Sequence, residues 1–375
     1  MNADPRVLVV FGTRPEAIKM CPLIKELQAR SGLETRVCVT GQHREMLDQV
    51  LQIFGVTPDY DLNVMQQGQS LTDITVRVLR GMEEVLASFS PSLVLVHGDT
   101  TTAFAAAVAA FYAKVCIGHV EAGLRTYDIY SPYPEEFNRQ AISLVAGLNF
   151  SPTQRAAANL RAAGVPQQRI FVTGNTAIDA LRITVRPDYR SPLTDWARGS
   201  RLLLVTAHRR ENLGAPLHTM LRAIRRIVEK YPDVKAIYPV HMNPEVASVA
   251  RQELSGSDRI RLVPPLPVDE FHNLISRCYL VLTDSGGIQE EATSLDKPVL
   301  VMRNVTERQE GLEAGVLRLV GTHEETICRA CRQLLDDPVE YAQMCRATNP
   351  YGDGWACRRI ADQVSAALNV VRTEA

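Results

Sequence analysis

The chain has 375 residues, of which 46% are hydrophobic and 22% are charged, an ordinary composition for a globular protein. The 41 basic and 42 acidic residues give a formal net charge of -1, which excludes a general basic surface for nucleic acid. The length favours two domains. The sequence has no run of 18 apolar residues and no charged leader before an apolar stretch, so we expect neither a membrane helix nor a signal peptide.

Eight cysteines are scattered along the chain, most of them inside apolar segments. A free thiol in such a segment packs as a small hydrophobic group, so we expect a reduced protein in the cytoplasm. Cys328 and Cys331 form a C-x-x-C motif, but they lie in a helical pattern from Glu324 to Leu335 and have no second pair. The motif therefore favours a core position, and we expect no metal site.

Short β-branched runs alternate with helical periodicity along the chain, which predicts an α/β fold with parallel sheets covered on both faces. The predicted strands are Val7–Phe11, Val37–Thr40, Leu93–Val96, Val115–Val120 and Ile170–Thr173 in the first half, and Leu202–Thr206, Lys235–Tyr238, Ile260–Val263, Val281–Thr283 and Val299–Met302 in the second.

The alternation breaks between Arg182 and Ser200, a segment with two prolines, a glycine and mixed charge, which we interpret as a linker. The turn-rich segment Asn349–Gly354 precedes a last helical pattern. We therefore expect a first domain over residues 1–182, a second over 200–354 and a C-terminal helix over 355–375.

Ligands of open α/β sheets bind beyond the carboxyl ends of the strands. In the first half these positions hold Arg14 and Lys19 at a helix start, then Asp99, then Glu121. Glu135 and Glu136 follow farther along. Simpler interpretations stay open, because Asp99 would serve equally as an N-cap and the paired glutamates as an acidic helix start.

In the second half His208 and Arg209 follow one predicted strand, and His241 follows the next. Ser285, Gly286 and Gly287 form a strand-to-helix turn whose backbone amides a phosphate could approach. Glu290 and Glu291, one turn further, could accept hydrogen bonds from ribose hydroxyls.

The two halves together predict a cleft in which a sugar meets the carboxylates of the first half and a nucleotide diphosphate meets the second. The sequence lacks G-x-G-x-x-G after the first strand, G-x-x-x-x-G-K-[ST] and H-E-x-x-H. These absences argue against a dehydrogenase, a P-loop kinase and a zinc hydrolase.

The segments FGTRPEAIK, HGDTTT, GHVEAGLRT, SPYPEEFNR, HRREN, YPVHMNP, DSGGIQEEA and NPYGDG together resemble the non-hydrolysing UDP-N-acetylglucosamine 2-epimerases, over essentially the whole chain. The resemblance implies two Rossmann-like domains facing across a cleft, the GT-B arrangement, with the C-terminal helix crossing back to the first domain. It implies a homodimer that interconverts UDP-GlcNAc and UDP-ManNAc for cell-surface polysaccharide, with no metal or NAD cofactor.

The resemblance also implies roles for individual residues. The catalytic residues would be Asp99, Glu121, Glu135 and His208. The contacts of the diphosphate would be Arg14, Lys19, His208, Ser285, Gly286 and Gly287. On the nucleoside side, Glu291 would bind the ribose, Phe271 and the backbone near Leu266 would contact uracil, and Arg308 would lie nearby.

A second UDP-GlcNAc, acting as an activator, would bind Gln42, Gln69, Glu135, Arg209 and His241. Two neighbours depart from the family pattern, because Glu45 stands where Gln is common and Gly68 where Arg is common. Both changes are expected to weaken this second site.

The chemistry explains why carboxylates and anion-binding groups occur together. The C2 proton of GlcNAc has no adjacent carbonyl to acidify it, so an enzyme without NAD would expel UDP from C1 while removing that proton, and then add UDP back. This needs a general base, a general acid and stabilisation of the departing diphosphate. A glycosyltransferase with the same donor, a hydrolysing epimerase and a nucleotide-sugar sensor remain the alternatives.

Overall fold

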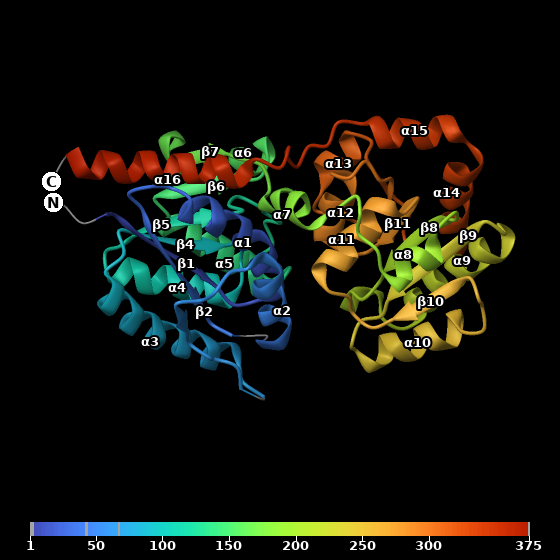
Figure 1. The fold of residues 1–375 in the computed structure, drawn as a ribbon, viewed down its shortest axis with the longest axis horizontal. Helices are drawn as coiled ribbons and strands as arrows, with labels where there is room; N and C mark the ends of the chain where they lie inside the picture. Colours follow the sequence, from blue (N-terminus) through green and yellow to red (C-terminus); the bar gives the residue numbers. More distant parts are fainter. Residues whose placement is uncertain (1–3, 42–43, 67, 374–375) are drawn as a thin grey trace. The chain divides into compact units, whose positions relative to one another are not determined.

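The computed structural model describes residues 4–41, 44–66 and 68–373, and the chain divides into two compact units (Figure 1). The first unit comprises Met1–Ile183 and Tyr351–Ala375, and the second comprises Thr184–Pro350. Both are parallel α/β units, which confirms the predicted fold class.

Within the described residues, the sheet of the first unit has seven parallel strands in the order β3-β2-β1-β4-β5-β6-β7. They are β1 (Arg6–Phe11), β2 (Glu34–Val39), β3 (Tyr60–Asp61), β4 (Leu93–His97), β5 (Cys116–Val120), β6 (Leu148–Ser151) and β7 (Ile170–Val172). The helices are α1 (Arg14–Gln28), α2 (Arg44–Phe54), α3 (Leu71–Phe89), α4 (Thr101–Tyr112), α5 (Glu135–Val145), α6 (Gln154–Ala162), η1 (Gln167–Arg169), α7 (Thr176–Thr184) and α16 (Ala356–Thr373).

The sheet of the second unit has six parallel strands, again within the described residues, in the order β10-β9-β8-β11-β12-β13. They are β8 (Arg201–Thr206), β9 (Val234–Pro239), β10 (Ile260–Val263), β11 (Leu280–Thr283), β12 (Val299–Val301) and β13 (Leu317–Leu319). The helices are α8 (Pro192–Ala197), η2 (Arg210–Asn212), α9 (Ala215–Lys230), α10 (Pro244–Leu254), α11 (Val268–Arg277), α12 (Gly286–Thr293), α13 (Gln309–Glu313), α14 (Glu324–Asp336) and α15 (Pro338–Arg346).

Each sheet reverses its strand order at one place, between β1 and β4 in the first unit and between β8 and β11 in the second. Such a reversal sends the helices on either side to opposite faces and leaves a crevice beyond the strand ends, where ligands of this fold bind. In each unit the topology therefore singles out the two loops that flank this crevice.

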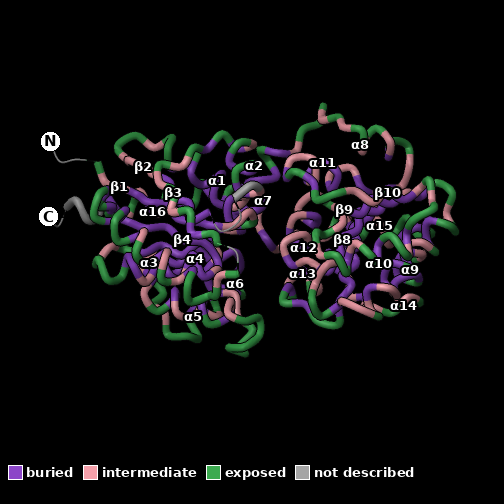
Figure 2. Tube along the Cα trace, turned by 90° about the horizontal axis from the view of Figure 1, so that it is seen from below, coloured by how far each residue is buried: buried purple, intermediate pink, exposed green. Residues whose placement is uncertain are grey.

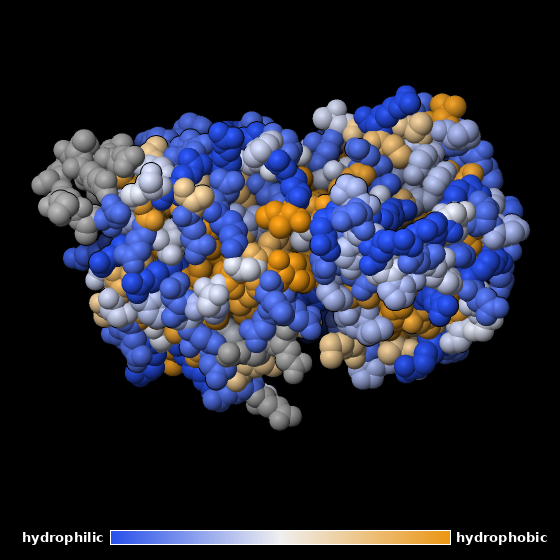
Figure 3. Space-filling view, in the orientation of Figure 1, coloured by the Kyte–Doolittle hydropathy of each residue, from blue (hydrophilic) through white to orange (hydrophobic). Residues whose placement is uncertain are grey.

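The apolar strands form the core of each unit, as the buried interior in Figure 2 shows. Residues such as Leu8, Val10 and Val96 of the first sheet are fully buried. Cys328 and Cys331 of α14 lie in the core of the second unit, where burial raises the pKa of both thiols. Hydrophilic residues predominate on the face seen in Figure 3. No helix of the described residues is long and apolar enough to cross a membrane.

The interpretation of Arg182 to Ser200 as a linker is wrong, because the segment contains helix α8 and belongs mostly to the second unit. Ser191 caps the helix and Pro192 begins it. Leu193, Trp196 and Ala197, at helical spacing, then pack on the core of the second unit. The prolines and mixed charge of this segment suggested a linker, but the helical spacing of its apolar residues was the better signal.

The other domain boundaries shift as well. The second unit begins at Thr184 and not at residue 200, and the chain returns to the first unit at Tyr351 and not after residue 354. Helix α16 belongs to the first unit (Figure 1). Its Asp362 pairs with Arg30 of the segment after α1 at 2.7 Å.

Three strands were not predicted. β3 has only two residues, and β13 has three. β6 carries two polar residues, yet Asn149 is fully buried and its amide donates to the carbonyl oxygens of Ala146 and Arg169. These partners of the amide N–H groups help a polar residue to occupy a buried strand between β5 and β7, which an apolar pattern cannot anticipate.

Candidate active site

The loop after β1 is packed tightly against its neighbours. A Cβ on Gly12 would lie 2.0 Å from Oγ1 of Thr40 and 2.7 Å from Oγ1 of Thr102, so only glycine fits. The carboxylate of Glu16 accepts hydrogen bonds from the amides of Gly12 and Thr13 and from the hydroxyl of Thr100. The start of α1 thus already holds an internal carboxylate, and anion binding here would depend on side chains such as Arg14 and Lys19.

Glu121 directly follows β5 with a left-handed backbone, φ 63°. Non-glycine residues adopt this conformation at a cost that the surrounding structure must offset, and such residues cluster at functional sites. Lys19 donates a hydrogen bond to its Oε2, and Nε2 of His97 lies 3.6 Å from the same oxygen. Burial raises the pKa of Glu121, but Lys19 and His97 outweigh burial and hold the pKa well below its usual range.

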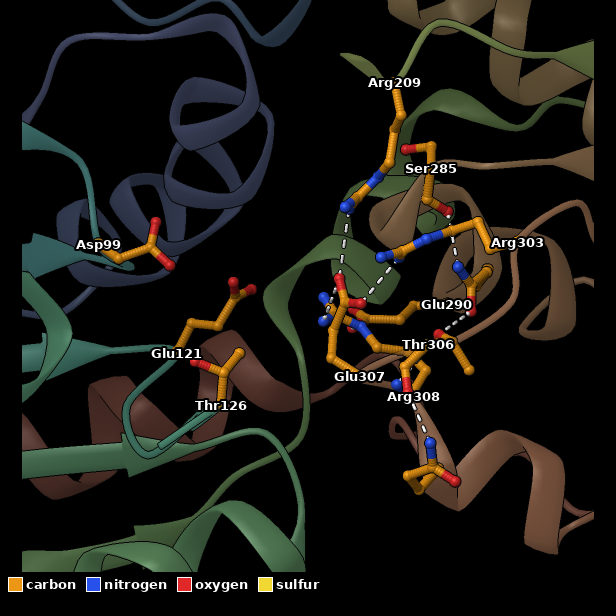
Figure 4. A network of polar contacts seen from close by, with 12 residues as sticks. Asp99, Glu121, Thr126, Arg209, Ser285, Glu290, Arg303, Thr306, Glu307 and Arg308 are labelled. Atoms are coloured by element: carbon orange, nitrogen blue, oxygen red, sulfur yellow. Dashed lines mark hydrogen bonds and ion pairs between the residues drawn. The ribbon is translucent and has the colours of Figure 1, made fainter. Parts of the chain in front are cut away.

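Asp99 lies two residues beyond β4, which is the neighbour of β5 in the sheet. Both carboxylates therefore project from the same edge of the sheet (Figure 4). Nη2 of Arg139 donates to Oδ2 of Asp99 at 2.5 Å, and the amide of Asn138 donates to its carbonyl oxygen at 2.8 Å. The N-cap of α4 is Thr100, so the interpretation of Asp99 as a cap is wrong.

The imidazole of His119 supports the turn that carries Asp99. Its Nε2 lies 2.7 Å from the carbonyl oxygen of Gly98. Burial lowers the pKa of His119 to about 4, so the ring is neutral near pH 7 and Nε2–H donates to that oxygen.

The structure separates the two glutamates that begin α5. Glu136 is fully buried, and its carboxylate accepts hydrogen bonds from the amides of Thr126 and Tyr127 and from the side chains of Arg139 and Gln140. Oε2 of Glu135 is buried and has no hydrogen-bond partner among the described residues. Glu136 is thus structural, while Glu135 is the one available for chemistry.

In the second unit the loop after β8 is held by Asp284, the residue that follows β11. Oδ2 of Asp284 accepts from the amides of His208 and Arg209, both at 2.9 Å, and from the side-chain amide of Asn212 at 3.0 Å. The imidazole of His208 stacks on that of His241, with ring centroids 5.2 Å apart.

Ser285 is the N-cap of α12, yet its side chain makes no capping hydrogen bond. A Cβ on Gly286 would lie 3.1 Å from Glu307, while one on Gly287 would meet no described atom within 4 Å. The packing of the protein therefore does not explain Gly287, whereas close approach of a phosphate to the helix start would.

Arg209, Arg303 and Arg308 gather around Glu307, as Figure 4 shows. Burial raises the pKa of Glu307, but the three guanidinium groups outweigh burial and bring it to about 2. Nε of Arg308 also donates to Glu290 at 2.6 Å. Glu290 is thereby committed to Arg308, which leaves Glu291 as the better candidate for a ribose ligand.

Nε2 of His272, a fully buried imidazole, lies 3.6 Å from Oε2 of Glu291. Nδ1 of the same ring lies 2.7 Å from the hydroxyl of Thr184. Leu266 and Phe271, the predicted uracil contacts, pack in one apolar cluster beside α11. These predicted nucleoside contacts therefore all lie on or next to α11 and α12.

The residues predicted for a second nucleotide sugar are spread over both units. Gln69 accepts hydrogen bonds from the amide of Gln66 and from Arg77, which fits a loop-stabilising role. Arg209 pairs with Glu307, and His241 stacks on His208. Gln42 lies outside the described residues.

Three residues of the site were given no role from the sequence, namely His97, Arg139 and Asp284. Asp284 directly follows a predicted strand, as Glu121 does, so the strand-end rule could have found it. His97 directly follows the predicted strand Leu93–Val96, so the same rule could have found it as well. Arg139 contacts Asp99 only because α5 packs there.

Comparison with known proteins gives a consistent result. A family model for UDP-N-acetylglucosamine 2-epimerase matches residues 25–365. The UDP-N-acetylglucosamine 2-epimerase of Bacillus subtilis is 53% identical over 359 residues, 96% of this chain and 94% of that protein. The S. aureus MnaA–UDP structure superposes with a TM-score of 0.92 at 48% identity, covering 97% of each chain. The Neisseria meningitidis UDP-GlcNAc 2-epimerase bound to UDP-GlcNAc gives 0.90 at 44%, covering 96% of this chain and 100% of that one.

Proposed function

Since this chain belongs to the UDP-N-acetylglucosamine 2-epimerase family, we propose that it interconverts UDP-GlcNAc and UDP-ManNAc by inverting C2 of the sugar. The observation that carries the proposal is the pair of carboxylates at neighbouring strand ends, Asp99 and Glu121. A third carboxylate, Glu135, begins the helix whose Arg139 contacts Asp99, and its buried Oε2 has no partner among the described residues. Proton transfer at carbon needs such groups, because water alone is too weak a base.

The proposed mechanism breaks two bonds of the substrate. A carboxylate removes the C2 proton while the C1–O bond breaks, giving a glycal and free UDP. UDP then adds back to C1 as a proton reaches C2 from the opposite face. The low pKa of Glu121 keeps the group ionised near neutral pH, the form in which a carboxylate can accept a proton.

The diphosphate that departs from C1 carries the developing negative charge. We assign its binding to His208, Ser285, Gly286 and Gly287 of the second unit and to Arg14 and Lys19 of the first. Helix amides and cations stabilise such charge without reorganising. Glu291, Phe271, Arg308 and the backbone at Leu266 would bind the nucleoside part.

The test is to incubate the purified protein with UDP-GlcNAc alone in D2O and follow the reaction by proton NMR. UDP-ManNAc carrying deuterium at C2 is the expected product. Full retention of the C2 proton would exclude the elimination mechanism. Free ManNAc with UDP would show a hydrolysing epimerase, and no turnover without an acceptor sugar would favour a glycosyltransferase.

We also propose that a second UDP-GlcNAc activates the enzyme. The stacking of His241 on His208 supports this, because a ligand held at His241 would bear on a residue of the diphosphate site. Glu45 and Gly68 should raise the concentration that is needed. A lag in turnover of pure UDP-ManNAc, abolished by trace UDP-GlcNAc, is expected, and immediate linear turnover would contradict the proposal.

A cytoplasmic homodimer is the assembly we propose. The buried thiols of Cys21 and Cys38 support a reducing compartment. Exposed apolar side chains on the helices of the first unit, Phe111, Tyr112 and Leu144, support a protein partner. Sedimentation velocity of the purified chain should give the mass of two copies, and a monomer at micromolar concentration would contradict it.

A further inference from the structure

Asp284 is a fully buried carboxylate placed beside the groups proposed to bind a diphosphate. A negative charge at this position repels a bound polyanion, so its presence beside a diphosphate site calls for a functional explanation. Oδ2 of Asp284 is engaged by the amides of His208 and Arg209 and by Asn212. Oδ1 is buried, has no hydrogen-bond partner among the described residues, and lies 3.7 Å from Nδ1 of His208.

Resting on the function proposed above, we propose that Asp284 is the positioning residue of His208, and that it makes His208 take up a proton when the diphosphate of UDP binds. The 3.7 Å between Nδ1 of His208 and Oδ1 of Asp284 is longer than a hydrogen bond, but a carboxylate only accepts, so a hydrogen on Nδ1 is the favourable arrangement beside this oxygen. In the neutral ring Nε2 is then an acceptor and repels phosphate oxygens. Only the imidazolium donates from both nitrogens.

The surroundings of His208 set the direction of this effect. Burial lowers the pKa of the ring, Asp284 opposes that change, and His241 and Arg209 lower the pKa further. The ring is therefore mostly neutral near pH 7 without ligand. A bound diphosphate adds negative charge at Nε2, and together with Asp284 it favours the imidazolium. Asp284 thus aligns the ring before binding, and its charge together with that of the diphosphate stabilises the proton on the ring once UDP is bound.

The experiment is calorimetric titration of the full chain with UDP at pH 7 in buffers of different ionisation enthalpy, which counts protons taken up. Because the terminal phosphate of UDP also titrates, the quantity of interest is the difference between the wild type and His208→Asn. The wild type should take up more protons than His208→Asn. Asp284→Asn should take up no more than His208→Asn and should bind UDP about 10-fold more weakly, a typical cost of a lost charge-assisted contact.

Two controls separate the proposal from a purely structural role. Asp233→Asn removes a carboxylate that pairs with Arg201 at the opposite end of β8, and it should match the wild type. His241→Asn removes the stacked imidazole, and proton uptake should persist in it. If Asp284→Asn does not fold, nitrogen NMR of His208 in the wild type decides, since a hydrogen on Nε2 rather than Nδ1 in the ligand-free neutral ring would overturn the proposal.

Equal proton uptake by the wild type and Asp284→Asn would also overturn it. Turnover of UDP-GlcNAc, measured in parallel, tests the proposed function separately. UDP binding with His208-linked uptake but no epimerisation would leave this inference standing without the function. Epimerisation with no His208-linked proton uptake would support the proposed function and overturn this inference. Absence of any UDP binding would contradict both.

Discussion

The ammonium group of Lys19, on α1, donates a hydrogen bond to the carboxylate of Glu121, 102 residues further along the chain at the end of β5. The resemblance to the family implied that Lys19 contacts a diphosphate and that Glu121 is catalytic. Their contact means that the cation also sets the ionisation of the carboxylate. It lowers the pKa of Glu121 against burial, with help from His97.

Replacing Lys19 by Met should raise the pKa of Glu121, because burial then acts with less opposition. An opposite charge at this range typically lowers a carboxyl pKa by about 1–3 units, so the acid limb of the pH profile of kcat/KM should move up by a similar amount. Lys25→Met is the matched control, because Lys25 lies on the same helix and is exposed. An acid limb at the wild-type position in Lys19→Met would show that this pair does not govern catalysis.

Glu135→Gln and Glu136→Gln should have opposite consequences. Glu135→Gln should lower turnover by about 10²–10⁴, the usual value of a positioned proton transfer, while the midpoint of thermal unfolding stays unchanged. Glu136→Gln should lower the free energy of unfolding by about 1–3 kcal/mol, because an amide cannot accept all the hydrogen bonds that the buried carboxylate accepts. Kinetic and denaturation measurements on both variants check the prediction. Loss of stability in Glu135→Gln with loss of turnover alone in Glu136→Gln would contradict it.

Gly287→Ala should weaken UDP binding without loss of stability. An added methyl group meets no described protein atom within 4 Å, and alanine is a better helix former than glycine. The same methyl group would stand where a phosphate approaches the start of α12. Calorimetry with UDP and a thermal melt of the same sample provide the measurement. Unchanged affinity for UDP would contradict the assignment of the diphosphate to this turn.

Glu307→Gln should flatten the dependence of stability on acid. The pKa of Glu307 in the folded protein is about 2, below the ordinary 4.5. The ionised group therefore stabilises the fold above about pH 4.5, and this contribution is lost as the pH falls towards 2. Urea denaturation of the wild type across that window should show a steeper loss than the variant. Glu229→Gln, an exposed glutamate of α9, is the control and should follow the wild type.

Much of the fold could be predicted from the sequence because its signals are local. The strands at the centre of each sheet are continuous apolar runs, and a run such as Val7–Phe11 has few alternatives to a buried strand. The strand-end rule then pointed to Asp99, Glu121 and His208, because the carboxyl ends of parallel strands lie at one edge whatever the details of packing.

Only the tertiary structure decided which polar groups remain available for chemistry. Glu135 and Glu136 are neighbours with the same side chain, and contacts with Thr126, Tyr127 and Arg139 commit one of them and not the other. Asp284 reaches the amide of His208 across 76 residues. Hydrogen bonds between residues so far apart in the sequence depend on how the strands and helices pack. Local sequence patterns therefore do not show which donors and acceptors pair.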